Sequence, residues 1–159
     1  MISQHVTSLE TSKRLKELGV KQESEFYWER RHHLESDKWV WGEGYRLVRT
    51  DKGHFYAAMV SIYVMYEKEL KESRISAFLS SELLKILPEK VVLPGEHAYH
   101  DSINNTFTLE VEFENGKCIY YYSNGDENVF YKKENFRENE AEARGILVEY
   151  LLENGLITL

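Results

Sequence analysis

One histidine-rich segment carries the chemistry that is easiest to recognise in this sequence. His97, His100 and Asp101 lie close together, after a Pro94-Gly95 pair that indicates a loop. On a helical turn the two imidazoles would converge and Asp101 could add an oxygen ligand, whereas on a strand the histidines would point to opposite faces. A metal site requires three or four converging ligands. We therefore expect solvent-exposed loop histidines here and predict no metal site.

A lone cysteine and a row of glutamates are the other groups that could react. Cys118 is the chain's one cysteine, so it forms no intramolecular disulfide and fits a reducing compartment. A nucleophilic thiol needs a lowered pKa and a neighbouring base, and we predict instead a buried, inert strand residue. Glu110, Glu112 and Glu114 share one strand face, which is typical of a solvated face rather than of paired glycosidase carboxylates. We predict no catalytic or cofactor-binding residue and no cofactor.

Aromatic residues make up 13% of the chain, and Tyr120, Tyr121 and Tyr122 are consecutive. Neighbours in a strand face opposite ways, so at least one of these tyrosines must point away from the core. Tyrosine and tryptophan are enriched in protein-binding surfaces. Sheet packing with hydrogen-bonded phenols is the interpretation we favour, and an aromatic binding surface is the alternative.

The chain is acidic, with 20 Lys and Arg residues against 27 Asp and Glu residues and a formal net charge of −7. An acidic surface repels phosphates, so we expect no nucleic-acid partner. Between Phe107 and Glu142 there are nine acidic and four basic residues, so most of the net charge lies in this segment. The negative electrostatic potential of this segment attracts basic protein surfaces. A solvated face that keeps the protein in solution explains the same pattern.

Nothing in the sequence suggests a membrane segment. Residues 55–66 form the longest largely apolar stretch, and crossing a bilayer takes about 20 apolar residues. Residues 1–5 lack the basic and apolar regions of a signal peptide. We therefore expect a cytoplasmic protein without a membrane partner.

Capping signals predict three helices, over residues 8–18, 81–87 and 140–153. The expected N-cap residues are, in order, Thr7, Ser80 and Asn139. Glu10 and Glu142 stand three residues after the first and last N-caps, at the capping-box position. Gly19 and Gly155 are expected to end the first and last helices in the left-handed conformation, and Pro88 ends the second. Leu151 would then contact Leu156.

Short aromatic segments predict strands over residues 25–29, 39–41 and 45–49, with a turn at Gly42-Glu43-Gly44. Residues 55–72 fit both a helical stripe and a strand. The charged end of that stretch favours a helix, because Glu67 and Lys71 are four residues apart.

The clearest strand pattern starts at Phe107. Phe107, Leu109, Val111 and Phe113 alternate with polar residues, so we expect these four side chains to face the core. Asn115-Gly116 is the strongest short signal for a type I′ hairpin turn, and strands over residues 117–123 and 128–131 would follow. The predicted fold is a single α+β domain over residues 1–159, in which an antiparallel meander packs against N-terminal, central and C-terminal helices.

Three segments stand out together: residues 9–19 (LETSKRLKELG), 75–88 (ISAFLSSELLKILP) and 141–155 (AEARGILVEYLLENG). In sequence and in order they resemble a family of small uncharacterised proteins encoded by bacteriophages and prophages. Residues 39–73 depart from that pattern, as an insertion would. The resemblance implies a bacterial host cell and carries no catalytic residues.

We therefore expect a phage or prophage accessory protein that is not an enzyme and that binds another protein, one with a basic surface. Two alternatives stay open. One is a small metal-dependent hydrolase that uses His97, His100 and Asp101, and the other is an acidic mimic of nucleic acid. Self-association of the chain is also left open.

Overall fold

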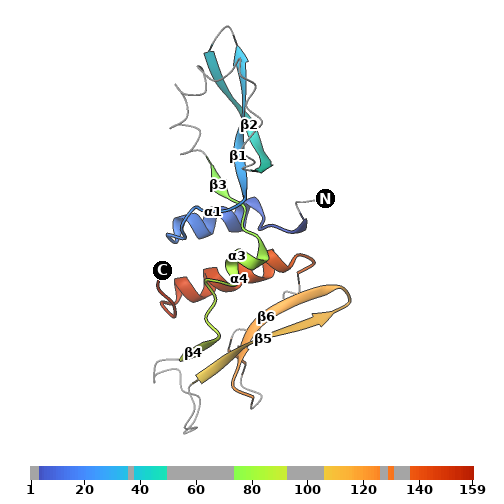
Figure 1. Ribbon diagram of the computed structural model, residues 1–159, viewed down its shortest axis with the longest axis vertical. Helices are drawn as coiled ribbons and strands as arrows, with labels where there is room; N and C mark the ends of the chain where they lie inside the picture. The colour runs from blue at the N-terminus through green and yellow to red at the C-terminus, as the bar shows by residue number, and fades with distance from the viewer. Residues whose placement is uncertain (1–3, 36–37, 50–73, 93–105, 126–128, 131–136) are drawn as a thin grey trace.

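The structure, a computed structural model, describes residues 4–35, 38–49, 74–92, 106–125, 129–130 and 137–159. Its helices are α1 (Leu9–Glu17), α3 (Ser80–Leu83) and α4 (Glu140–Glu153). The described residues form successive layers: a three-stranded antiparallel sheet at one end, then α1, then α4 with α3, and a four-stranded antiparallel sheet at the other end (Figure 1). The predicted α+β fold class is confirmed.

The first sheet contains β1 (Phe26–Glu35), β2 (Lys38–Arg49) and β3 (Ile75–Ser76), in the order β2-β1-β3. The turn predicted at Gly42–Gly44 is wrong, because these residues lie inside β2. Arg30 pairs with Tyr45 and His32 with Trp41, so three residues of β2 face Arg31 across a β-bulge. Gly44 has φ +78°, a conformation that glycine adopts without steric cost. The glycines that indicated a turn are thus explained by the bulge.

The second sheet contains β4 (Lys90–Val92), β5 (Thr106–Glu114), β6 (Lys117–Ser123) and β7 (Val129–Phe130), in chain order across the sheet. Asn115 and Gly116 have φ of 49° and 76°, as a type I′ turn requires, so the predicted hairpin is confirmed. The meander from β5 through β6 to β7 is confirmed as well. The pairing of β4 with the far edge of β5 was not predicted from the sequence.

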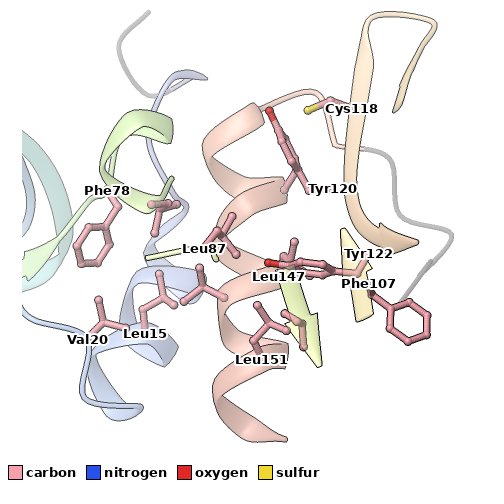
Figure 2. Close-up of a cluster of buried hydrophobic side chains, with 14 residues drawn as sticks. Leu15, Val20, Phe78, Leu87, Phe107, Cys118, Tyr120, Tyr122, Leu147 and Leu151 are labelled. Carbon is pink, nitrogen blue, oxygen red and sulfur yellow. The ribbon is translucent and has the colours of Figure 1, made fainter. Parts of the chain in front are cut away.

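Helix α4 lies between α1 and the second sheet, so it is buried on more than one side. Its buried residues are Ala141, Ala143, Gly145, Leu147, Val148 and Leu151. Figure 2 shows Tyr122 of β6 on one side of α4, and Leu15 and Phe78 on the other side. The buried residues of α4 therefore do not form a single apolar stripe, because the helix packs against α1 and α3 in one direction and against β6 in another.

Both long helices end as predicted. Gly19 and Gly155 follow α1 and α4 with φ of +87° and +65°. The N–H of Val20 then donates to the Leu15 carbonyl at 3.0 Å, and the N–H of Leu156 donates to the Leu151 carbonyl at 2.9 Å. These bonds define the Schellman motif at each end.

The beginnings of α1 and α3 lie one residue away from the predicted N-caps. Ser8, not Thr7, caps α1, because its hydroxyl accepts the Thr11 N–H at 3.2 Å. Leu79, not Ser80, precedes α3, and the Glu82 carboxylate accepts the Leu79 N–H at 2.8 Å. Helix α3 itself is shorter than predicted, and hydrogen-bonded turns continue it to Leu87.

Glu142 also departs from its predicted role within α4. Asn139 is the N-cap, as predicted, and its side chain accepts the Ala141 N–H at 3.0 Å. The Glu142 carboxylate instead reaches α1, where it accepts bonds from the Ser8 N–H at 2.7 Å and the Thr11 hydroxyl at 2.7 Å. A negative group at this position also favours the N-terminus of α1 electrostatically.

Some predictions fall outside the described residues: the helix over 55–72, the strand or loop around Pro94-Gly95, and the His97, His100 and Asp101 cluster. The single-domain assignment and the insertion over 39–73 stay predictions, although residues 39–49 are part of β2 and pair with β1. Within the part of the chain that is described, no helix is long and apolar enough to cross a membrane.

Candidate binding surface

The apolar face of β5 is buried at one end and exposed at the other. Phe107 is buried, but Val111 is 43% exposed and Phe113 is 68% exposed. The prediction that all four alternating apolar residues face the core is therefore wrong for this half of the strand. We refer to Val111 and Phe113, with the β5 backbone between them, as the hairpin edge.

The position of α4 explains why the hairpin edge is exposed. Val111 pairs with Tyr120 and Phe113 pairs with Cys118, so these side chains share one face of the sheet. Tyr120 and Cys118 are buried because β6 packs against α4. Strand β5 lies one strand further from that helix (Figure 1), and the hairpin edge therefore extends past the layer that covers β6.

The backbone of the hairpin edge is also unpaired among the described residues. Strand β4 pairs with Thr106–Thr108, and the last bond on that side joins the Leu109 N–H to the Glu89 carbonyl at 2.9 Å. Outward and inward groups alternate along an antiparallel strand, so the N–H and C=O groups of Val111 and Phe113 point to the same side as those of Leu109. No hydrogen bond among the described residues reaches these groups.

Strand β4 ends before it reaches this edge. In the register of β4 and β5, Pro88 would face Glu110, but the pairing ends one residue earlier, at Glu89. The chain instead turns there into the segment that follows α3, and the Pro88 carbonyl accepts the Tyr122 hydroxyl at 2.6 Å. The sequence predicts Pro88 as the end of a helix, whereas the point at which β4 stops pairing with β5 follows only from the strand register.

The opposite face of β5 is acidic. Glu110 and Glu114 are exposed and Glu112 is partly buried, so the predicted solvated face is confirmed for the two outer carboxylates. At the hairpin edge, β5 thus presents apolar side chains on one face of the sheet and carboxylates on the other face.

Tyr120 fixes the hairpin to α4. Its hydroxyl donates to the Glu140 carboxylate at 2.5 Å and accepts a bond from Arg144 at 2.8 Å. Burial and the Glu140 carboxylate raise the pKa of Tyr120 to about 12, and the bond from Tyr120 holds the pKa of Glu140 below its usual value. Tyr120 and Tyr122 therefore serve sheet packing, as we favoured, and Tyr121 lies on the other face of β6.

Cys118 is buried, as predicted, and its thiol donates weakly to the Arg137 carbonyl at 3.6 Å. Burial raises the pKa of this thiol, which is opposite to what a nucleophile needs. No three His, Cys, Asp or Glu side chains within the described ranges are placed to hold a metal ion.

Comparisons of the chain with protein-family models, curated proteins and solved structures found no match. The feature that suggests a function is the hairpin edge, which combines two exposed apolar side chains, backbone groups that no described residue bonds, and carboxylates on the opposite face of β5.

A second surface feature is a hollow of about 640 Å³ between α1 and α4, which is lined by four glutamates and three basic residues. Glu149 lines it, and one of its carboxylate oxygens is buried without a hydrogen-bond partner among the described residues. Burial, followed by the charges of Glu142 and Glu153, raises the pKa of Glu149 to about 7, against the opposing effect of Arg14. Glu10 of α1 adds to the negative field.

We expect Glu149→Gln to stabilise the protein at pH 8 and to have little effect at pH 5. The folded state holds the Glu149 proton more tightly than the unfolded state, so the free energy of unfolding of the wild type falls as the pH rises from about 4.5 to about 7. Glutamine stays neutral, and the gain at pH 8 should be about 1–3 kcal/mol. Urea unfolding at both pH values measures it.

The control for this prediction is Glu138→Gln, which changes an exposed carboxylate in the segment before α4. It should show no comparable gain on going from pH 5 to pH 8. An equal effect of the two substitutions at pH 8 would contradict the prediction, because it would show that the surroundings of Glu149 do not destabilise its ionised form.

Proposed function

We propose that this chain is a protein-binding module without enzymatic activity, an accessory protein of a phage or prophage that acts in the bacterial cytoplasm. The observation that carries this proposal is the hairpin edge, where Val111 and Phe113 are 43% and 68% exposed. Clustered exposed apolar side chains rimmed by polar residues mark interaction sites on soluble proteins. The phage or prophage assignment rests on the sequence resemblance.

The rigidity of the hairpin supports this function. The type I′ turn at Asn115-Gly116 and the bonds of Tyr120 to Glu140 and Arg144 hold the hairpin edge in one conformation before a partner arrives. A surface that is ordered before binding loses less conformational entropy on association. Phenylalanine is also among the residue types enriched in interfaces.

The charge of the surrounding segment favours a basic partner. Glu110 and Glu114 are exposed beside the hairpin edge, and the segment from Phe107 to Glu142 has five more acidic than basic residues. Complementary charge speeds association and makes it sensitive to salt. Binding of such a partner should weaken as the ionic strength rises, because salt screens exposed charges.

Capture from bacterial lysate with matched surface variants tests the proposal. Phe113→Ser removes the most exposed aromatic side chain of the hairpin edge, and Leu84→Ser changes an exposed leucine elsewhere, 48% exposed. We expect proteins retained by the wild type and Leu84→Ser to be lost with Phe113→Ser, while the melting temperatures stay close. Identical captured sets for all three proteins would contradict the proposal.

The other functions that the sequence left open predict different results. A metal-dependent hydrolase predicts tight stoichiometric zinc binding in calorimetry that is lost in a His97→Ala, His100→Ala variant. A nucleic-acid mimic predicts captured nucleic-acid-binding proteins that duplex DNA displaces, and that bind independently of Phe113. We expect no zinc heat and no gel shift with duplex DNA at physiological salt.

A further inference from the structure

We infer that the partner contributes an extended segment with alternating apolar and basic residues, which pairs antiparallel with β5 at the hairpin edge and adds a strand to the second sheet. This inference rests on the proposed protein-binding function and specifies its partner.

The backbone of β5 supplies the hydrogen-bonding sites. The outward N–H and C=O groups of Val111 and Phe113 lie on the side where β4 ends at Glu89, and no described residue bonds to them. Extended peptides bind to such edges through main-chain hydrogen bonds. Antiparallel pairing is the more stable direction and places one partner residue directly opposite Val111 and another opposite Phe113.

The side chains of β5 then determine the partner's sequence pattern. Residues directly opposite each other in an antiparallel pair point to the same face. The partner residues opposite Val111 and Phe113 therefore meet apolar groups, whereas their neighbours meet Glu110 and Glu114, which are both exposed. A partner strand therefore complements both faces of β5 if it has apolar residues opposite Val111 and Phe113 and Lys or Arg opposite the glutamates.

Charge argues against a second copy of this chain as the added strand. Every antiparallel register of β5 with itself that places Val111 or Phe113 opposite either of these two residues also places glutamates opposite glutamates, because the two types alternate there. Like charges directly opposite each other destabilise a sheet. Charged residues on an edge strand are a recognised protection against such self-association, and the same charges attract a basic strand.

A pair of synthetic peptides tests this pairing. Both alternate lysine and valine. One has backbone N-methyl groups on the lysines, so that only its valine N–H groups can donate hydrogen bonds, and the other has the methyl groups on the valines, so that only its lysine N–H groups can donate. We expect the first peptide alone to bind and to slow the amide hydrogen exchange of Val111 and Phe113. Equal binding of the two peptides, or unchanged exchange at both amides, would overturn the inference.

Variants of the protein supply independent measurements. A Glu110→Gln, Glu114→Gln double variant should weaken binding of the first peptide roughly threefold to tenfold. Val111→Pro should abolish it, because proline removes an outward N–H and is tolerated where a strand edge faces solvent. If Val111→Pro unfolds the protein, the comparison of the two peptides still decides the question.

The outcome separates this inference from the proposed function. If the first peptide does not bind but Phe113→Ser still loses captured proteins, strand addition is wrong and protein binding through the hairpin edge stands. If Phe113→Ser captures the same proteins as the wild type, the proposed function fails too. A dimer of the wild-type chain that Val111→Pro dissociates would show that the edge binds a second copy, and would overturn the inference.

Discussion

Leu151→Ala is expected to lower the free energy of unfolding by about 2–5 kcal/mol, as truncations of buried leucines do. Leu151 is fully buried in the main hydrophobic cluster, between α1 and the second sheet (Figure 2). Packing on both sides of α4 leaves little room for neighbouring groups to fill the space, so the cost should lie high in that range. The melting temperature should fall by about 4–20 °C.

The control is the same substitution at an exposed leucine. Leu84 is 48% exposed, and Leu84→Ala should change stability by only about 0.5 kcal/mol or less. Leu151 also supplies the carbonyl that accepts the Leu156 N–H at the end of α4, a backbone bond that alanine keeps. A melting temperature unchanged in Leu151→Ala would contradict the burial of this residue.

Gly145→Ala is expected to destabilise the protein by about 1–3 kcal/mol, as other insertions of a methyl group into a packed core do. A Cβ at this position would lie 2.7 Å from the Thr11 methyl group and 2.9 Å from the Thr7 methyl group. Alanine normally stabilises a helix by about 1 kcal/mol relative to glycine. The expected loss therefore has the opposite sign to helix propensity and comes from the close crossing of α1 and α4.

Serine substitutions at Thr11 in α1 and at Thr7, the residue before its N-cap, test the cause. A Thr7→Ser, Thr11→Ser variant removes both methyl groups and keeps both hydroxyls, including the one that donates to Glu142. Gly145→Ala introduced into that variant should be neutral or stabilising. If Gly145→Ala lowers the free energy of unfolding as much in that variant as in the wild type, then the two threonine methyl groups are not what excludes a side chain at Gly145. Thermal or urea unfolding of the four proteins measures the coupling.

The elements that could be predicted from the sequence are those whose cause is local. The turn at Asn115-Gly116 forms because these two residue types accept positive φ. The ends of α1 and α4 depend on one glycine each, Gly19 and Gly155, and on carbonyls within the same helix turn. Such interactions join residues a few positions apart, so residue type and spacing are sufficient to predict them.

The first residue of a helix could not be predicted from local interactions alone. Ser8 and Thr7 are both suitable N-caps by type, and the choice was made by distant partners: Glu142 bonds to the Ser8 N–H, and Thr7 is buried against Phe78. Similarly, the glycines at 42 and 44 fit a turn and a bulge equally well, and the pairing of β2 with β1 selected the bulge.

The candidate site depended most on the tertiary structure. Alternation in β5 correctly gave a strand with an apolar and an acidic face, but not which part of the apolar face α4 covers. Phe107 is buried and Phe113 is exposed although both occupy the same face. Burial is decided by the position of a second layer, and the unpaired edge among the described residues by the place where β4 stops pairing with β5. The sequence alone thus determined the strand and its two faces, and only long-range packing determined that its end is a surface.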